Sequence, residues 1–168
     1  MKINCLPSWL VVLCALFALA SHAQAQIFAN SAEWKESDVP PPPAFDVKKL
    51  VKVDVPASLA LVYGVDPASI SISKSDSLVR YVMVATSASG ATNVMYEALR
   101  CSTGEVKTYA RYSSDGKWSP VSNPQWRSVF DSMPSNHALR FARAGACDAD
   151  APASSVEAIV NSLKNPRR

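Results

Sequence analysis

Few side chains in this chain of 168 residues have the types and spacing that acid–base or nucleophilic chemistry requires. A serine hydrolase needs a nucleophile, a base and an orienting acid, and the Gly-x-Ser-x-Gly motif that presents such a serine is absent from the sequence. His137 is the only histidine beyond the first 25 residues, and it lies beside an expected helix cap, where a solvated polar residue is typical. We therefore predict no catalytic residue.

Glu97 is the carboxylate that most needs an explanation. It lies in the middle of an expected strand, between Met95 and Leu99, and a carboxylate within an apolar strand usually has a partner. Arginines of the expected neighbouring strands can supply that partner, and they are Arg80, Arg100 and Arg111. A cross-strand ion pair on the solvated face of a sheet is the favoured interpretation, and a catalytic carboxylate is the alternative.

The sequence predicts neither a metal site nor a cofactor. Asp148 and Asp150 have the spacing of a calcium-binding loop, but the glycine and the distal glutamate of such a loop are missing. No glycine-rich loop for a phosphate group is present. The 17 basic and 14 acidic residues give a net charge of +3, which excludes a polybasic nucleic-acid binder, so no nucleic-acid partner is expected.

The N-terminus has the order of a secretory signal peptide. Lys2 carries a positive charge, an apolar run follows from Trp9 to Ala20, and small side chains precede a cleavage site. A membrane span needs about 20 apolar residues, which is more than this run contains. We expect a cleaved signal peptide over residues 1–25, a mature chain that begins at Gln26 without a transmembrane segment, and a periplasmic or secreted location.

Cys101 and Cys147 are the two cysteines that stay in the mature chain. Export delivers them to a compartment where disulfides form and persist, so we expect the two to form one structural disulfide. A reactive thiol and a metal pair are the alternatives. The metal pair would need at least two further ligands, and no close Cys-x-x-Cys spacing is present.

The first two zones of the mature chain differ in pattern. Residues 26–44 are polar and then proline-rich, and the four prolines at 40–43 favour an extended arm. The zone that follows alternates apolar and polar residues between short polar loops, which predicts an antiparallel meander of about five strands with one packed and one solvated face. The expected strands cover residues 59–63, 69–73, 78–86, 92–101 and 106–113.

The third zone changes to helical periodicity. Asn123 as a cap and Pro124 at the first position predict a short helix with an apolar stripe from Trp126 to Met133. A second helix is expected over residues 138–144, after a cap at Ser135 or Asn136.

The last helix has the clearest signal. A capping-box pattern begins at Ser154, and apolar residues recur with helical spacing from Val156 to Leu163. Strands followed by helices predict an α+β fold, in which the C-terminal helices pack on one face of the antiparallel meander. We expect residues 45–168 to form a single globular domain behind the proline-rich N-terminal arm.

Short strings along the chain resemble those of the CNP1-like family, which comprises small exported proteins of Gram-negative bacteria with no assigned activity. The strings are Trp34-Lys35-Glu36, Leu61-Val-Tyr-Gly-Val-Asp-Pro-Ala-Ser-Ile-Ser-Ile72, Arg80-Tyr-Val-Met-Val84, Asn93-Val-Met-Tyr-Glu97, Arg100-Cys101, Tyr109-Ala-Arg111 and Trp118. The resemblance implies a single periplasmic or envelope domain, and it supplies no catalytic residue.

The expected function follows from the missing chemistry. We predict a non-catalytic binding or structural module of the cell envelope, with the solvated sheet face as its contact surface, because tyrosine and arginine on a rigid sheet suit recognition. The predicted contact residues are Tyr96, Glu97, Tyr109, Arg111 and Trp34. The expected partner is an envelope protein or a cell-wall component. The alternative is a small hydrolase or lyase of the envelope that uses Glu97 with Arg80 or Arg100.

Overall fold

The computed structural model describes residues 33–56, 60–132 and 135–166. The chain divides into two compact units, Met1–Lys35 and Glu36–Arg168, and the helices and strands reported below belong to the second. The expected signal peptide and the expected cleavage site after Ala25 lie outside the described residues, so both stay predictions.

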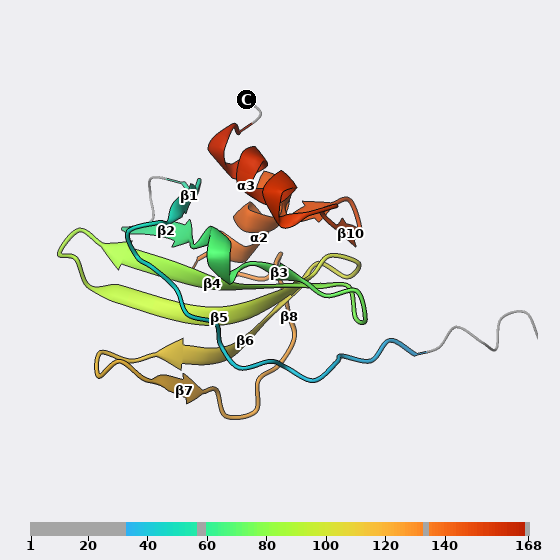
Figure 1. Cartoon of the computed structure of the whole chain (residues 1–168), viewed down its shortest axis with the longest axis horizontal. Coiled ribbons are helices and arrows are strands. Elements are labelled where there is room, and N and C mark those ends of the chain that lie inside the picture. The colour runs from blue at the N-terminus through green and yellow to red at the C-terminus, as the bar shows by residue number, and fades with distance from the viewer. Residues whose placement is uncertain (1–32, 57–59, 133–134, 167–168) are drawn as a thin grey trace, which may run out of the picture. The chain divides into compact units, whose positions relative to one another are not determined.

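An antiparallel sheet forms the centre of the second unit (Figure 1). Its main path runs β1-β2-β4-β5-β6-β7, with β3 paired to β4 and β8 paired to β6. The strands are β1 (Val51–Val53), β2 (Leu61–Val65), β3 (Ser71–Ile72), β4 (Leu78–Ser87), β5 (Thr92–Arg100), β6 (Glu105–Tyr112), β7 (Trp118–Pro120) and β8 (Arg127–Ser128). The predicted meander is confirmed, and β1, β7 and β8 extend it.

The strand expected over residues 69–73 is much shorter than its alternating pattern indicates. A 3-10 turn, η2 (Pro67–Ser69), occupies the start of that range, because the Asp66 side chain caps the turn and Pro67 lies at its first position. Ser69 then turns its hydroxyl to the sheet and accepts a hydrogen bond from the backbone N–H of Val82 at 3.0 Å. Of the predicted strand, only Ser71 and Ile72, which form β3, pair with β4.

Two of the three predicted helices are present. α2 (His137–Phe141) continues into a π-helical turn, η3 (Ala142–Ala146), and α3 (Val156–Lys164) begins at the cap Ser155, whose hydroxyl accepts from the Ala158 N–H at 3.1 Å. Gly145 has φ of 118°, and a Cβ there would lie 2.5 Å from Ser162 Cβ, so only glycine lets α3 approach η3. The short hairpin β9 (Cys147–Asp148) and β10 (Ala151–Pro152) joins the two helices.

The helix predicted from Asn123 is wrong. Asn123 has a positive φ of 54°, and residues 124–126 form neither helix nor strand before β8 pairs with β6. The Val129 N–H donates to the Gly104 carbonyl at 2.9 Å, and Val129 is buried. Pairing with the edge of β6 therefore buries Val129, while Phe130 of the same predicted stripe stays exposed and Met133 lies outside the described residues. Tertiary context overrides the local pattern.

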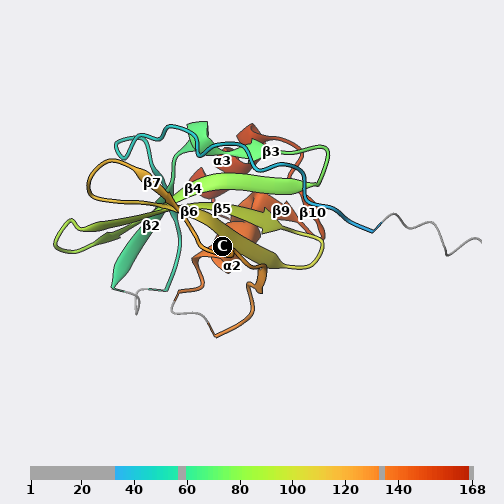
Figure 2. The ribbon, with the colours of Figure 1, turned by 90° about the horizontal axis from the view of Figure 1, so that it is seen from below.

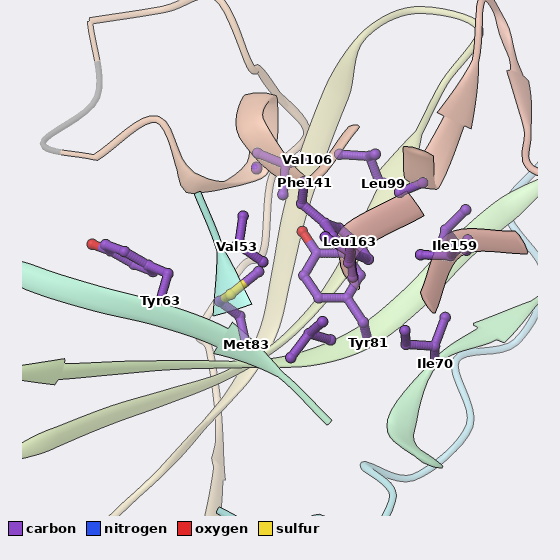
Figure 3. Packing of buried hydrophobic residues seen from close by; sticks show 14 of the residues in the cluster. Val53, Tyr63, Ile70, Tyr81, Met83, Leu99, Val106, Phe141, Ile159 and Leu163 are labelled. Atoms are coloured by element: carbon purple, nitrogen blue, oxygen red, sulfur yellow. The ribbon is translucent and has the colours of Figure 1, made fainter. Parts of the chain in front are cut away.

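The core lies between one face of the sheet and the two helices (Figure 3). Tyr81 and Met83 of β4 point to this side, and Phe141 of α2 packs on them, with the Tyr81 and Phe141 ring centroids 4.5 Å apart. Ile159 and Leu163 of α3 complete the layer. Each such side chain contributes about 1.5–3 kcal/mol when it leaves water, so the predicted packing of helices on one sheet face is confirmed.

The opposite face of the sheet is covered as well, and the expectation of a solvated face is wrong. Residues 36–46, which we name the strap, cross β4–β6 on the side away from α2 (Figures 1 and 2). The Phe45 ring meets the rings of Tyr112 and Trp118 edge-on, at centroid distances of 5.1 and 5.9 Å. As a result the residues from Leu78 to Ala85 are all buried, which is the pattern of a strand covered on both faces.

Cys101 and Cys147 form the predicted disulfide, with their Cα atoms 5.6 Å apart. Cys101 follows β5 and Cys147 begins β9. The bond therefore links the sheet to the helical layer.

Loss of this disulfide should strongly destabilise the fold. Cys101→Ala combined with Cys147→Ala opens a loop with a sequence separation of 46, and the chain-entropy model predicts a loss of about 4 kcal/mol in the free energy of unfolding. Urea denaturation measures this loss. Reductant should lower the wild-type midpoint to that of the double variant and leave the double variant unchanged; a wild-type midpoint that ignores reductant would contradict the prediction.

Candidate functional site

The most elaborate polar cluster surrounds Glu97, on the helix-facing side of β5. Glu97 is only 2% exposed. The carboxylate accepts hydrogen bonds from the Tyr81 hydroxyl at 3.1 Å and from the Thr108 hydroxyl at 3.0 Å. Tyr81, Glu97 and Thr108 are cross-strand neighbours in β4, β5 and β6, so the strand register alone brings them together on one face.

His137 provides the third contact to Glu97 from the start of α2. Its Nε2 lies 2.9 Å from Glu97 Oε2, and its Nδ1 lies 2.7 Å from the Ser135 hydroxyl oxygen. The imidazole stacks on the Tyr63 ring at a centroid distance of 5.1 Å with the planes 4° apart. Because an ionised carboxylate only accepts, Nε2 carries a proton, and in the neutral ring Nδ1 accepts from Ser135.

The surroundings of Glu97 set its charge. Burial raises its pKa, but the charge of His137 and the hydrogen bonds from His137, Thr108 and Tyr81 outweigh burial and hold the pKa below the ordinary 4.5. Burial and the neighbouring Glu97 raise the pKa of Tyr81 well above its ordinary value. At neutral pH the site therefore holds a carboxylate and a phenol that keeps its proton.

The favoured interpretation of Glu97, a cross-strand ion pair with an arginine on a solvated face, is wrong. The residue lies beneath the helices instead of on a solvated face, and its partners are His137, Thr108 and Tyr81 in place of an arginine. His137 was not predicted as that partner, and it is buried instead of solvated. The signal that could have found it was available, because the chain offers a single histidine beyond the N-terminal segment and a buried carboxylate needs a donor.

Ser135, His137 and Glu97 lie in the order of nucleophile, base and orienting acid. A general acid has to hold a proton near neutral pH, and the lowered pKa of Glu97 leaves it ionised there, which disfavours a hydrolase or lyase that uses Glu97 in this role. The orienting acid of a triad is ionised, so the lowered pKa is compatible with that role. The two cavities described below are lined by other residues. What the arrangement does in this fold is to fix the start of α2 to the middle of the sheet.

The predicted contact residues do not form one surface. Tyr96 and Tyr109 lie beneath the strap on the other face of the sheet and are 2% and 7% exposed, because successive strand residues point to opposite faces. Arg111 is exposed, and its Nη1 lies 3.4 Å from Asn93 Oδ1. Trp34 belongs to the preceding unit, and a binding role for Trp34 stays a prediction.

Glu36 attaches the strap to the sheet. Its carboxylate accepts from Lys107 Nζ at 2.8 Å, from the Tyr109 hydroxyl at 2.5 Å and from Trp126 Nε1 at 3.2 Å. Burial raises the pKa of Glu36, but Lys107 and the hydrogen bonds lower it by more, so the pKa lies below its ordinary value. Burial and Glu36 together raise the pKa of Tyr109, so a proton stays between the two groups.

A second ionic contact supports the strap beside Glu36. Arg80 pairs with Asp76 at 2.7 Å, and both side chains are buried. Ser37 of the strap donates to the same Asp76 carboxylate through its hydroxyl and, at 3.0 Å, through its backbone N–H. Burial raises the pKa of Asp76, but these hydrogen bonds lower it far below its ordinary value, so the carboxylate stays charged under the strap.

A cavity of about 250 Å³ opens next to the disulfide, and we name it the disulfide cavity. Phe130 stands beside it with 67% of its surface exposed. The ring lies against Gly104, where a Cβ would come within 2.9 Å of it. The lining residues are Leu99, Arg100, Cys101, Gly104, Val129, Phe130, Leu139, Ala142, Arg143, Cys147 and Ala149. The lining residues are thus mostly apolar, and two of them are arginines.

Within residues 33–56, 60–132 and 135–166, no three side chains of His, Cys, Asp or Glu gather as a metal site would require. Over the same residues, no helix has the length and apolar character needed to cross a membrane.

Residues 29–164 match the family model of the CNP1-like family. The chain belongs to the CNP1-like family. No curated protein and no solved structure is similar enough to match it. The matched range of this CNP1-like chain includes the strap, the Glu97 cluster and both disulfide cysteines.

Glu97→Gln should change both the stability and its pH dependence. Removing one partner of a buried pair costs about 3 kcal/mol or more, so we expect the free energy of unfolding at pH 7 to fall by that amount. Because the folded-state pKa of Glu97 is lowered, its ionised form contributes stability above the unfolded value of 4.5, and this contribution is lost as the pH falls through the folded pKa. As the pH falls below 4.5, the free energy of unfolding of the wild type should therefore decrease more than that of Glu97→Gln.

Denaturant titrations over a pH series measure this difference. Asp131→Asn, which removes an exposed carboxyl, is the matched control and should follow the wild type. Equal acid dependence of wild type and Glu97→Gln would show that the Glu97 charge is not coupled to folding.

Glu36→Gln should loosen the strap without unfolding the core. The substitution removes the charge from three hydrogen bonds, and charge-assisted bonds of this kind contribute about 2 kcal/mol. We expect faster hydrogen exchange at the Ser37 amide, which donates to Asp76, while amides of β4 and β5 keep their rates. Glu33→Gln, in the preceding unit, is the control. An unchanged Ser37 rate would mean that Glu36 does not hold the strap.

Proposed function

We propose that this CNP1-like protein is exported to the periplasm or beyond and acts there as a non-catalytic binding module of the cell envelope. The N-terminal pattern of a secretory signal peptide supports export. The disulfide between Cys101 and Cys147 is compatible with an oxidising compartment.

The observation that carries a binding role is the disulfide cavity. It is apolar, and the exposed ring of Phe130 extends the apolar surface at its side. The walls come from β5, from α2 with its π-helical turn, and from the disulfide that joins the two. Ligand sites are typically concave, apolar and largely pre-formed, with a few polar groups that orient the ligand. This cavity has all of these properties.

Most of the residues predicted for a contact on the sheet face are not accessible to a partner, which favours the cavity as the contact site. Glu97, Tyr96 and Tyr109 are buried, and Glu97 and Tyr109 already have hydrogen-bond partners within the fold. A partner could reach them only after α2 or the strap had moved. The cavity requires no such movement.

The partner class follows from the lining. A cell-wall polymer presents many hydroxyl groups, and burying these without hydrogen-bond partners is costly. The lining offers apolar groups and guanidiniums. We therefore propose an envelope component that contributes an apolar group, and we place it ahead of a polar wall component.

Photo-crosslinking in living cells tests this function. A photoreactive phenylalanine at Phe130 should give an adduct that disappears when Ala142→Leu fills the cavity, and the same group at Val62, an exposed residue of β2 outside the cavity, should give none. The absence of a Phe130 adduct, or identical adducts from both positions, would refute the cavity as the contact site.

A fluorophosphonate probe tests the enzymatic alternative in the same samples. The non-catalytic role predicts no labelling of the wild type. Labelling at Ser135 that is lost in Ser135→Ala and retained in Ser132→Ala would instead establish a hydrolase based on Ser135, His137 and Glu97.

A further inference from the structure

We propose that the ligand of the disulfide cavity is an anionic amphiphile with a single chain, whose alkyl or acyl part enters the cavity and whose anionic head group lies at Arg143. This inference rests on the proposed binding function and names its ligand class. Three properties of the cavity carry it, namely the hydrogen-bonding character of its side chains, the placement of its charges and its volume.

The lining side chains donate hydrogen bonds but offer no strong acceptor. Arg100 and Arg143 are the polar side chains among the lining residues, and all others are apolar side chains, glycine or the disulfide cysteines. A guanidinium has donors only. A peptide or a glycan brings N–H or O–H donors that need acceptors, whereas a carboxylate or phosphate on an alkyl chain brings acceptors at one end and no polar group elsewhere. The lining is complementary to the last of these.

The positive charge available to a ligand is that of Arg143. Arg100 is engaged with Glu105, with Nη1 and Oε2 3.5 Å apart. Arg143 lies on η3, is exposed, and forms no ion pair within the part of the chain that the structure describes. An anion placed there can form bidentate, charge-assisted hydrogen bonds.

Arg143 also lies at a boundary between apolar and polar surface. Together with Cys147 it lines a second cavity of about 440 Å³, whose other residues include Arg140, Asp148, Ser154 and Asn165. A head group at Arg143 therefore faces a polar groove while the chain attached to it lies in the apolar cavity. This change of surface character at one arginine matches the change within an amphiphile.

The volume sets the number of chains. About 250 Å³ is below the roughly 300–1,000 Å³ of sites that take drug-sized ligands. One short chain fits this space. A lipid with two chains does not, which predicts a free single-chain amphiphile as the ligand instead of an intact bilayer lipid.

Calorimetric titration of the full mature chain with decanoate tests the proposal. Decanoate, used below its critical micelle concentration, should bind with one site per chain and at least about tenfold more tightly than decanol, because decanol lacks the charge. Decylammonium should bind no better than decanol. Vesicles of anionic diacyl lipid should not compete with decanoate.

Matched variants assign the binding to the cavity and to Arg143. Arg143→Met should weaken decanoate by about tenfold and leave decanol unchanged, while Arg127→Met, which removes an exposed arginine from β8, should change neither. Ala142→Leu should abolish binding of both ligands, and Ala91→Leu, in an exposed hairpin loop, should not. Leu139→Phe is a second way to fill the cavity if Ala142→Leu lowers the melting temperature.

The outcomes separate this inference from the proposed function. Equal binding of decanoate and decanol, or no effect of Arg143→Met, would overturn the anionic head group and leave an apolar binding site. Absence of decanoate binding together with a cavity-dependent Phe130 adduct would overturn the amphiphile and point to a protein partner. Absence of both decanoate binding and the adduct would refute the binding function itself.

Discussion

The buried carboxylate of Glu97 is the contact on which the arrangement of helices and sheet depends. It lies where β4, β5 and β6 are adjacent and accepts hydrogen bonds from Tyr81 and Thr108 within the sheet and from His137 of α2. A carboxylate at this depth is unfavourable unless its hydrogen-bonding capacity is satisfied. The bonds from Tyr81 and Thr108 hold the carboxylate within the sheet, and the bond from His137 joins the start of α2 to it, so the requirement of one side chain helps to orient the helical layer above the core.

On the other face of the sheet, carboxylates that accept several hydrogen bonds attach the strap in the same way. Glu36 and Asp76 are carboxylates whose pKa values are lowered by the donors around them. Glu36 itself belongs to the strap, and Asp76 accepts from Ser37 of the strap. The proline-rich middle of the strap cannot form a ladder of backbone hydrogen bonds with β6, because proline has no N–H group to donate. Side-chain contacts at its ends and the Phe45 ring therefore attach it. Both faces of β4 are consequently buried, and the polar clusters of this protein serve its architecture.

The proposed binding site is the cavity next to the disulfide. There the end of β5, the π-helical turn and the loop that carries Phe130 meet without filling the space between them. The disulfide closes one wall, and Gly104 lets the Phe130 ring approach the turn before β6. Residues of two secondary-structure layers and the disulfide that joins them line the site. Its combination of an apolar lining with an available guanidinium at Arg143 is the property that distinguishes it from the buried polar clusters.

Local and covalent features were predictable from the amino-acid sequence. Alternating residues predicted the meander, the capping pattern at Ser154 predicted α3, and Cys101 with Cys147 predicted the disulfide, since each of these signals acts within one element or through a single bond. The side that each polar residue faces was decided by the tertiary structure. The period of the strand separates Tyr96 from Glu97, but only the docking of the strap and of α2 decides that both are buried and which donors they meet. The segment after Asn123 likewise became a strand because the edge of β6 offered backbone partners that no local pattern reveals. The burial of these side chains, their hydrogen-bond donors and the strand after Asn123 all depend on contacts between residues distant in sequence, and a single sequence does not reveal such contacts.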